Sequence, residues 1–209
     1  SAPSLSSPPN KVEPIEPGDL NPPGSPSKNQ KMKAIIQAHS GEYIDLENPH
    51  KSKFLIEDIA HGLANTCRFG GQCSPFYSVA QHCVHVSLLV PPRYAKAGLL
   101  HDGAEAYVGD VSSPLKALLR AYQYIEEDVQ FQIWLQHCGQ GLDHPEVKKA
   151  DLIALATERR DLMPNTPTNE AWSMLDGITP DQDKIEPWGP YTAKEAFLAR
   201  HRQIVSEQD

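Results

Sequence analysis

The chain has 209 residues, of which 39% are hydrophobic, and this combination suits one domain with a hydrophobic core. Its formal net charge of −8 and its pI of about 5.6 argue against long-range attraction to nucleic acid or to anionic lipid. No apolar run approaches the length of a membrane-spanning helix, and the first residues lack the charged start and apolar stretch of a secretory signal. We therefore expect a cytoplasmic protein that binds neither nucleic acid nor a membrane.

The first 30 residues are rich in Pro, Ser, Gly and Asn and contain few apolar side chains. Such a segment cannot bury enough surface to offset the entropy that it would lose on ordering. We predict a disordered tail over residues 1–30, followed by a single domain over residues 31–209.

Helical spacing of apolar residues dominates the rest of the chain; Ile56, Ile59 and Leu63 are one example. Pro91 and Pro92 end one helix and open the next, and Pro114 lies near the first turn of a short helix. We expect residues 41–49 to be extended or a loop, and residues 164–190 to be a Pro-rich return. A short helix is predicted over residues 32–39, and further helices over residues 56–65, 78–90, 94–107, 121–138, 145–162 and 192–205. The predicted fold class is therefore all-α, one domain with five to seven main helices.

The four cysteines form no CxxC pair and no dense framework of the kind that disulfides stabilise. We expect them to be reduced thiols, as in a cytosolic protein. A disulfide between Cys67 and Cys73 is the alternative. The cysteines are Cys67, Cys73, Cys83 and Cys138.

Ionisable side chains gather at the end of the predicted helix over residues 94–107. His101 and Asp102 directly follow an apolar pair, and Glu105 lies one helical turn further on. His82 lies on the preceding predicted helix, which a short connection makes an antiparallel neighbour. The sequence therefore predicts that two imidazoles and two carboxylates lie near one another.

Imidazole nitrogens and carboxylate oxygens together suit Mn, Fe, Co, Ni or Zn. A water on such a metal has a lowered pKa, which makes hydroxide available for hydrolysis. Asp151 heads an apolar run on a distant helix, so we expect it to face inward as a further ligand. Taken singly, each His is also compatible with a hydrogen-bonded core residue, and Asp151 with a helix cap or a salt-bridge partner; their combination favours a metal site.

This pattern resembles that of the HD-domain metal-dependent phosphohydrolases, in which helices contribute a His, a His-Asp pair and a distant Asp. More specifically, the chain resembles bacterial 5′-deoxynucleotidases and the related bacteriophage deoxyadenosine triphosphate triphosphohydrolases. The resemblance covers about residues 35–162, and it rests on four stretches. These stretches are CRFGG at 67–71, FYSVAQH at 76–82, HDGAEAYVGDVSSPLK at 101–116 and KKAD at 148–151.

The resemblance implies a role for each matching residue. Glu105 and Asp110 would position or activate the attacking water and handle the proton of the leaving group. Arg68 and Lys116 would contact phosphate, and Phe69 would place a ring beside the sugar or base. The implied metal ligands are His82, His101, Asp102 and Asp151.

Each substrate or catalytic role has a plainer alternative. Arg68 is also compatible with a surface salt bridge, Lys116 with a solvated position, and Asp110 with a turn after Gly109. Gln81 departs from the family pattern, which often has Glu directly before the metal His. On a helix this side chain would point away from the metal, so we expect only an indirect effect.

The resemblance implies an enzyme that hydrolyses the 5′-phosphate ester of a small deoxynucleotide with a divalent ion (Mn, Co, Mg, Zn or Fe). We favour a triphosphohydrolase that splits dATP into deoxynucleoside and tripolyphosphate. The alternatives are a nucleotidase acting on deoxynucleoside monophosphates, a hydrolase of another phosphoester, and a non-catalytic nucleotide-binding module. Relatives form dimers or rings, so we expect a homo-oligomer, located in the host cytoplasm if a phage encodes it.

Overall fold

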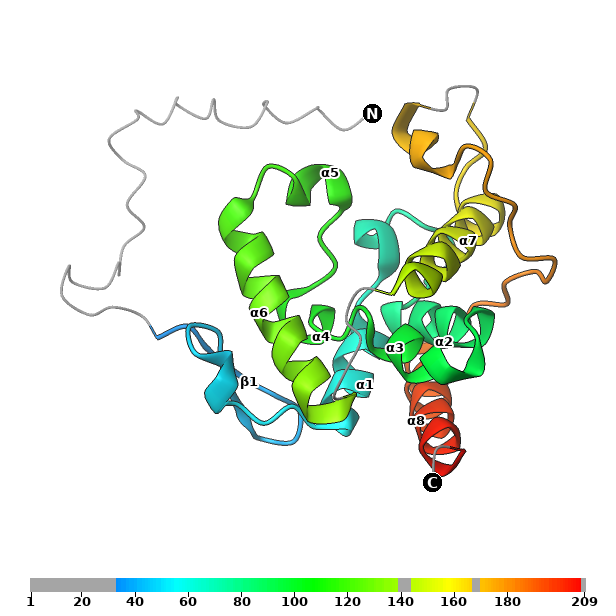
Figure 1. Cartoon of the computed structure of the whole chain (residues 1–209). Helices are drawn as coiled ribbons and strands as arrows, with labels where there is room; N and C mark the ends of the chain where they lie inside the picture. The colour runs from blue at the N-terminus through cyan, green and yellow to red at the C-terminus, as the bar shows by residue number, and fades with distance from the viewer. Residues whose placement is uncertain (1–32, 139–143, 167–169, 208–209) are drawn as a thin grey trace, which may run out of the picture. The chain divides into compact units, whose positions relative to one another are not determined.

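Helices make up most of the computed structural model, which describes residues 33–138, 144–166 and 170–207. This confirms the predicted all-α class, and the five longest helices within those residues are labelled in Figure 1. The predicted tail, residues 1–30, lies outside the described residues. The longest helices are α1 (Ile56–Asn65), α2 (Val79–Leu89), α6 (Arg120–His137), α7 (Pro145–Leu162) and α8 (Pro190–Ser206).

Shorter elements connect these helices. The short α-helices are α3 (Ala95–Leu100), α4 (Glu105–Val108) and α5 (Ser113–Lys116). The 3-10 helices are η1 (Pro49–Lys51), η2 (Arg68–Gly71), η3 (Pro92–Tyr94) and η4 (Glu170–Leu175), and the strands are β1 (Ile35–Gln37) and β2 (Tyr43–Asp45). Among the described residues, no helix is both long enough and apolar enough to cross a membrane.

Local signals set the ends of the long helices. Both α1 and α7 have the predicted bounds, and Pro145 fills the first turn of α7, where its missing amide hydrogen costs nothing. The Ser78 side chain caps α2 by accepting a hydrogen bond from the Gln81 amide at 3.2 Å. Capping and proline geometry are readable from sequence, which is why these bounds were predictable.

The predicted helix over residues 32–39 is wrong where the structure describes it. Ile35–Gln37 instead pairs antiparallel with Tyr43–Asp45, and Ile36 lies opposite Ile44. β-branched isoleucines favour a strand, and Gly41 closes the turn with a φ of 99°, which other residues rarely adopt. Ile44 is fully buried, so the pairing joins the hairpin to the helical core.

The predicted helix over residues 94–107 is interrupted between α3 and α4. In a continuous helix the Ala104 amide would donate to the Leu100 carbonyl. Here the Gln130 side chain forms hydrogen bonds with both groups instead. Its Oε1 accepts from the Ala104 amide at 2.8 Å, and its Nε2 donates to the Leu100 carbonyl oxygen at 2.7 Å. A side chain inserted into the backbone ladder breaks a helix at that point.

Helix α2 packs against four other helices, α1, α3, α7 and α8 (Figure 1). It is buried on nearly all sides: Val79, Cys83 and Val86 are fully buried, and so is the polar His82. A helix surrounded by others presents its polar side chains to its neighbours instead of to water. This arrangement places His82 against α3 and α7.

Gly62 of α1 offers a test of this packing. A Cβ atom at Gly62 would lie 2.6 Å from the Ala106 carbonyl oxygen of α4. We expect Gly62→Ala to lower the free energy of unfolding by about 1–3 kcal/mol, because the clash outweighs the better helix propensity of alanine. Gly189→Ala, which meets nothing within 4 Å, is the control. Urea denaturation gives both values, and a Gly62→Ala chain as stable as the wild type would contradict the packing.

Candidate metal centre

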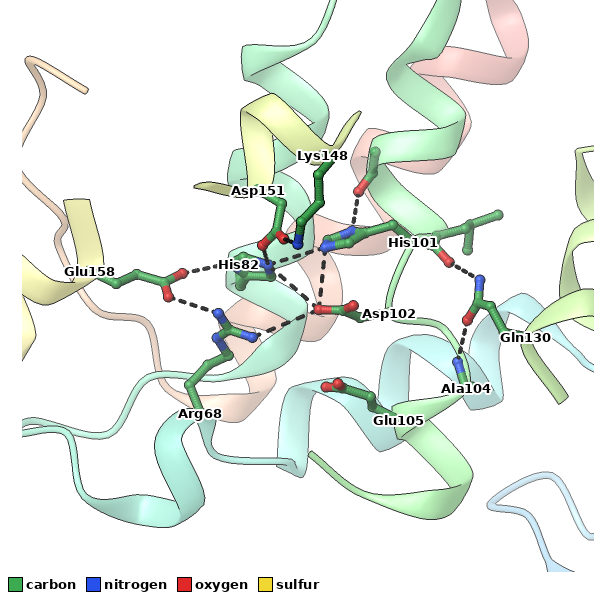
Figure 2. A network of polar contacts seen from close by, with 12 residues as sticks. Arg68, His82, His101, Asp102, Ala104, Glu105, Gln130, Lys148, Asp151 and Glu158 are labelled. Atoms are coloured by element: carbon green, nitrogen blue, oxygen red, sulfur yellow. Dashed lines mark hydrogen bonds and ion pairs between the residues drawn. The ribbon is translucent and has the colours of Figure 1, made fainter. Parts of the chain in front are cut away.

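The four predicted metal ligands converge on one point (Figure 2). His82 comes from α2, His101 and Asp102 follow α3, and Asp151 comes from α7. His82 Nε2 lies 3.2 Å from His101 Nε2 and 3.5 Å from Asp151 Oδ1. Asp102 Oδ2 lies 3.3 Å from His101 Nε2 and 3.5 Å from His82 Nε2. His82, His101 and Asp151 thus offer ligand atoms within 4.8 Å of one another, and Asp102 lies within 3.5 Å of both imidazoles.

Both histidines are held so that Nε2 faces the cluster. His82 Nδ1 lies 2.6 Å from Glu158 Oε1, and His101 Nδ1 lies 2.9 Å from the Gly98 carbonyl oxygen. A metal-ligating histidine characteristically uses its other nitrogen in this way, which fixes the ring and the tautomer. The donor set therefore fits a divalent ion such as Mn, Fe, Co, Ni or Zn.

Glu158 is a residue that our sequence analysis missed. It is fully buried, and its two oxygens serve His82 and Arg68, at 2.6 and 3.0 Å. It lies seven residues after Asp151, so both project from the same face of α7. An acidic residue two turns beyond a proposed ligand was the signal that could have identified it.

Arg68 balances the buried charge beside the cluster. Its Nη2 lies 3.0 Å from Glu158 Oε2, and its Nη1 lies 3.7 Å from Asp102 Oδ2. Burial opposes its charge, but Glu158 and Asp102 outweigh this effect and raise the pKa of Arg68 well above its usual value. Burial likewise disfavours ionised Glu158, yet Arg68 and His82 bring the pKa of Glu158 down to about 2. Arg68 is therefore a buried ion-pair partner, and the surface salt-bridge alternative is wrong.

The surroundings of His82 raise the pKa of its imidazole. Burial and Arg68 lower its pKa, but Glu158 and Asp151 outweigh them, so that the pKa of His82 is about 9. Asp151 is half-buried, and its contacts with His82 and His101 hold the pKa of Asp151 well below its usual value. A cation at His82 Nε2 therefore competes with a proton.

Glu105 lies beside the cluster and is also buried. Burial, then the charges of Asp102 and Asp110, raise the pKa of Glu105 well above its usual value. Its Oε2 has no hydrogen-bond partner among the described residues. The carboxyl group borders a cavity of about 500 Å³ that His101, Asp102 and Lys116 also line. A carboxyl group with a raised pKa beside such a cavity is suited to general acid–base chemistry.

A second cavity opens on the other side of His101 and Asp102. Its volume is about 460 Å³, and Asp151, Lys148 and Trp134 are among the residues that line it. Lys148 donates to Asp151 Oδ2 at 2.9 Å, and its side chain is largely exposed. Both cavities thus border part of the cluster.

The structure places the remaining predicted site residues at different distances from the cluster. Lys116 Nζ donates to Glu126 Oε1 at 2.7 Å and lies 4.0 Å from Glu105 Oε1. Asp110 is half-buried, and burial together with Asp102 raises the pKa of Asp110 against the opposing effect of Arg68. The Phe69 ring packs edge-on against Trp172 of η4, with centroids 6.0 Å apart. Lys116 thus lines the cavity, whereas Phe69 is held by η4.

Three cysteines bear on the site or on the predicted redox state of the chain. Cys83 offers a sulfur near His101 and Asp102, although the sequence did not single it out as a ligand. Cys67 and Cys73 are both free thiols with sulfurs 3.8 Å apart, so the alternative of a disulfide is not what the structure shows.

Gln81 points away from the metal cluster, as expected. Its Nε2 donates to the Glu186 carbonyl, and its Oε1 accepts from the Trp188 amide, both at 2.8 Å. It therefore ties α2 to the segment before α8. A residue adjacent to His82 is thereby fixed without touching the cluster.

The fold and the cluster together define the protein as a helical domain with buried His and Asp side chains that could hold a metal ion. No family model matches the chain. It is 39% identical to the uncharacterized protein YfdR of Escherichia coli strain K12, over 82% of this chain and 96% of that protein. It is 40% identical to the uncharacterized protein RCAP_rcc00048 of Rhodobacter capsulatus, over 79% and 93% respectively. The chain belongs to the family of these two proteins.

Glu158→Gln tests the buried ion pairs. Removing the carboxylate charge leaves Arg68 buried without its closest counterion, and we expect a loss of about 3–5 kcal/mol in the free energy of unfolding. Glu195→Gln, at an exposed position on α8, is the matched control and should change stability by less than about 0.5 kcal/mol. Urea denaturation measures both. Equal stability of the two variants would show that Glu158 does not compensate Arg68.

Proposed function

We propose that this chain is a metal-dependent phosphohydrolase of the HD-domain type that acts on a small deoxynucleotide. One observation carries the proposal: His82, His101, Asp102 and Asp151 converge beside the buried carboxyl group of Glu105. This is the arrangement that the sequence resemblance implies. A purely structural cluster would not need a protonatable carboxyl group facing a cavity.

The two imidazoles and two carboxylates would hold the ion, and Mn, Co, Mg, Zn and Fe are the candidates. A bound divalent cation supplies positive charge that lowers the pKa of water and neutralises phosphate oxygens. Phosphoryl transfer depends mainly on such charge neutralisation and on alignment of the nucleophile. The centre therefore offers the chemistry that ester hydrolysis requires.

The chain's own residues supply the rest. Arg68, whose Nη1 lies 3.7 Å from Asp102 Oδ2, would contact a phosphate oxygen, as the resemblance implies. Lys116 lines the same cavity as Glu105 and adds a second cation. Glu105, whose pKa is raised by its burial, and Asp110 would position the attacking water and handle the proton of the leaving oxygen.

The favoured substrate is a deoxynucleoside triphosphate, above all dATP, with deoxynucleoside and tripolyphosphate as products. The CRFGG and FYSVA stretches support this choice, because they resemble the phage-type triphosphohydrolases. Phe69, paired with Trp172, offers an aromatic edge for the sugar or base. A nucleotidase that releases orthophosphate from monophosphates uses the same centre and is the second candidate. We further propose a cytoplasmic homo-oligomer.

Substitution of the ligands separates binding from chemistry. We expect His101→Ala and Asp102→Ala to lose both bound metal and activity, since each removes a ligand. Glu105→Ala should keep the metal but lose about 10²- to 10⁴-fold in rate, because only proton transfer is removed. Metal content by plasma mass spectrometry and turnover of dATP give the two readouts. Full turnover by His101→Ala with the metal removed would refute the proposed mechanism.

A substrate panel separates the two candidate activities. Deoxynucleoside triphosphates and monophosphates are incubated with the metal-loaded chain, and orthophosphate and tripolyphosphate are quantified separately. Tripolyphosphate from dATP supports the favoured activity, and orthophosphate from monophosphates supports the nucleotidase. Turnover of neither class, by a chain shown to hold metal, would contradict the deoxynucleotide proposal.

A further inference from the structure

We propose that Gln130 is a positioning residue. It prevents the backbone around His101 and Asp102 from closing into a regular helical turn, and so orients both side chains for the metal ion. Gln130 comes from α6, which contributes none of the proposed ligands. Its side-chain amide forms two hydrogen bonds with the backbone, to the Leu100 oxygen and from the Ala104 amide. We call these two bonds the Gln130 bracket. The inference rests on the metal centre proposed above but not on the identity of the substrate.

The bracket spans the ligand pair. Leu100 and Ala104 flank His101 and Asp102, and their carbonyl and amide are the two groups that a regular α-helix would join directly. The intervening backbone instead forms hydrogen bonds between residues three apart. The Gly103 amide donates to the Leu100 carbonyl and the Glu105 amide to the Asp102 carbonyl, both at 3.0 Å. Without Gln130 the Ala104 amide is free to bond Leu100 and close the turn. Closing it would move Asp102 relative to His101.

The contact between α6 and this turn is built for close approach. A Cβ atom at Gly103 would lie 3.3 Å from Ile133 Cγ2, which is tighter than most such contacts. Ile133 is fully buried and lies one turn after Gln130, so both reach the turn from the same face of α6. Glycine at position 103 thus allows α6 to come near enough for the bracket to form.

Gln130 also lies where it can affect the centre without binding the ion. It borders both cavities that flank His101 and Asp102. Figure 2 shows its amide turned toward the backbone on the far side of His101 from His82. Both ends of the amide are engaged, so Gln130 acts on the centre through the backbone.

The same helix contains a natural control. Gln136 Oε1 accepts from the Phe54 amide and its Nε2 donates to the Ser52 carbonyl, both at 3.0 Å. Gln136 therefore forms an equivalent pair of backbone hydrogen bonds, about 9 Å further along α6. Its partners lie between η1 and α1 and include no part of the metal centre. Gln130→Met and Gln136→Met remove the same kind of interaction and differ in what it supports.

The experiment titrates the full chain with Co²⁺ and follows its visible absorption bands, which report ligand geometry. Urea denaturation of each variant is measured in parallel. We expect Gln130→Met to weaken Co²⁺ binding about ten- to hundredfold and to alter the bands, as losses of groups that orient ligands do. Gln136→Met should lose comparable stability and keep wild-type Co²⁺ binding. Equal Co²⁺ binding by the wild type and Gln130→Met would overturn the inference.

A measurement on the wild type covers the case in which Gln130→Met does not fold. Amide hydrogen exchange should show that the Ala104 amide is protected although it lies at a helix break. If the Ala104 amide exchanges as fast as an amide without a hydrogen bond, the Gln130 bracket does not form and the inference is wrong. A wild-type chain that binds no Co²⁺ would contradict the proposed metal centre, and with it this inference. A wild-type chain that binds Co²⁺ no better than Gln130→Met would contradict the inference alone.

Discussion

The buried carboxylate of Glu158 is the group on which the rest of the centre depends. It bonds Nδ1 of His82 with one oxygen and the Arg68 guanidinium with the other. Neither His82 nor Arg68 can be buried at low cost without such a partner. By satisfying both, Glu158 turns His82 Nε2 toward Asp151 and the His101–Asp102 pair. The direction of the central ligand thus follows from one interaction behind it.

Acidic side chains outnumber basic ones around the cluster, and this has consequences for ligands. The nearby cations are Arg68, Lys116 and Lys148, and the nearby carboxyl groups are those of Asp102, Glu105, Asp110, Asp151 and Glu158. Such a surrounding attracts a divalent cation and repels a free phosphate. We infer that an anionic substrate binds well only when the cation is present, so that ion and substrate act together. The overall acidity of the chain is compatible with this order.

Much of the helical framework could be predicted from the sequence because its signals are local. Apolar spacing and Pro145 were enough for α1 and α7. The hairpin was missed because Ile35–Gln37 becomes a strand only through its pairing with Tyr43–Asp45. The break between α3 and α4 was missed for a similar reason. It depends on Gln130, which lies 26 residues beyond Ala104 on another helix.

The candidate site likewise has a part that local sequence signals predict and a part that depends on contacts between distant residues. His101, Asp102 and Glu105 are close in sequence, and their grouping is a matter of helical spacing. Asp151 was expected to face inward because it heads an apolar run, and the structure places it 3.5 Å from His82. Glu158 and Gln130 were not predicted, because each acts by contacting a residue distant in sequence. The roles of Phe69, Asp110 and Lys116 toward a substrate stay predictions.

The central claim is that two imidazoles and two carboxylates hold a divalent cation. X-ray absorption spectroscopy of the Co²⁺-loaded chain tests it most directly, because imidazole rings scatter with a characteristic pattern. The account predicts a first shell of nitrogen and oxygen at about 2.0–2.2 Å, with scattering from two imidazoles and no sulfur. A sulfur contribution near 2.3 Å from Cys83, or a spectrum without imidazole, would contradict it.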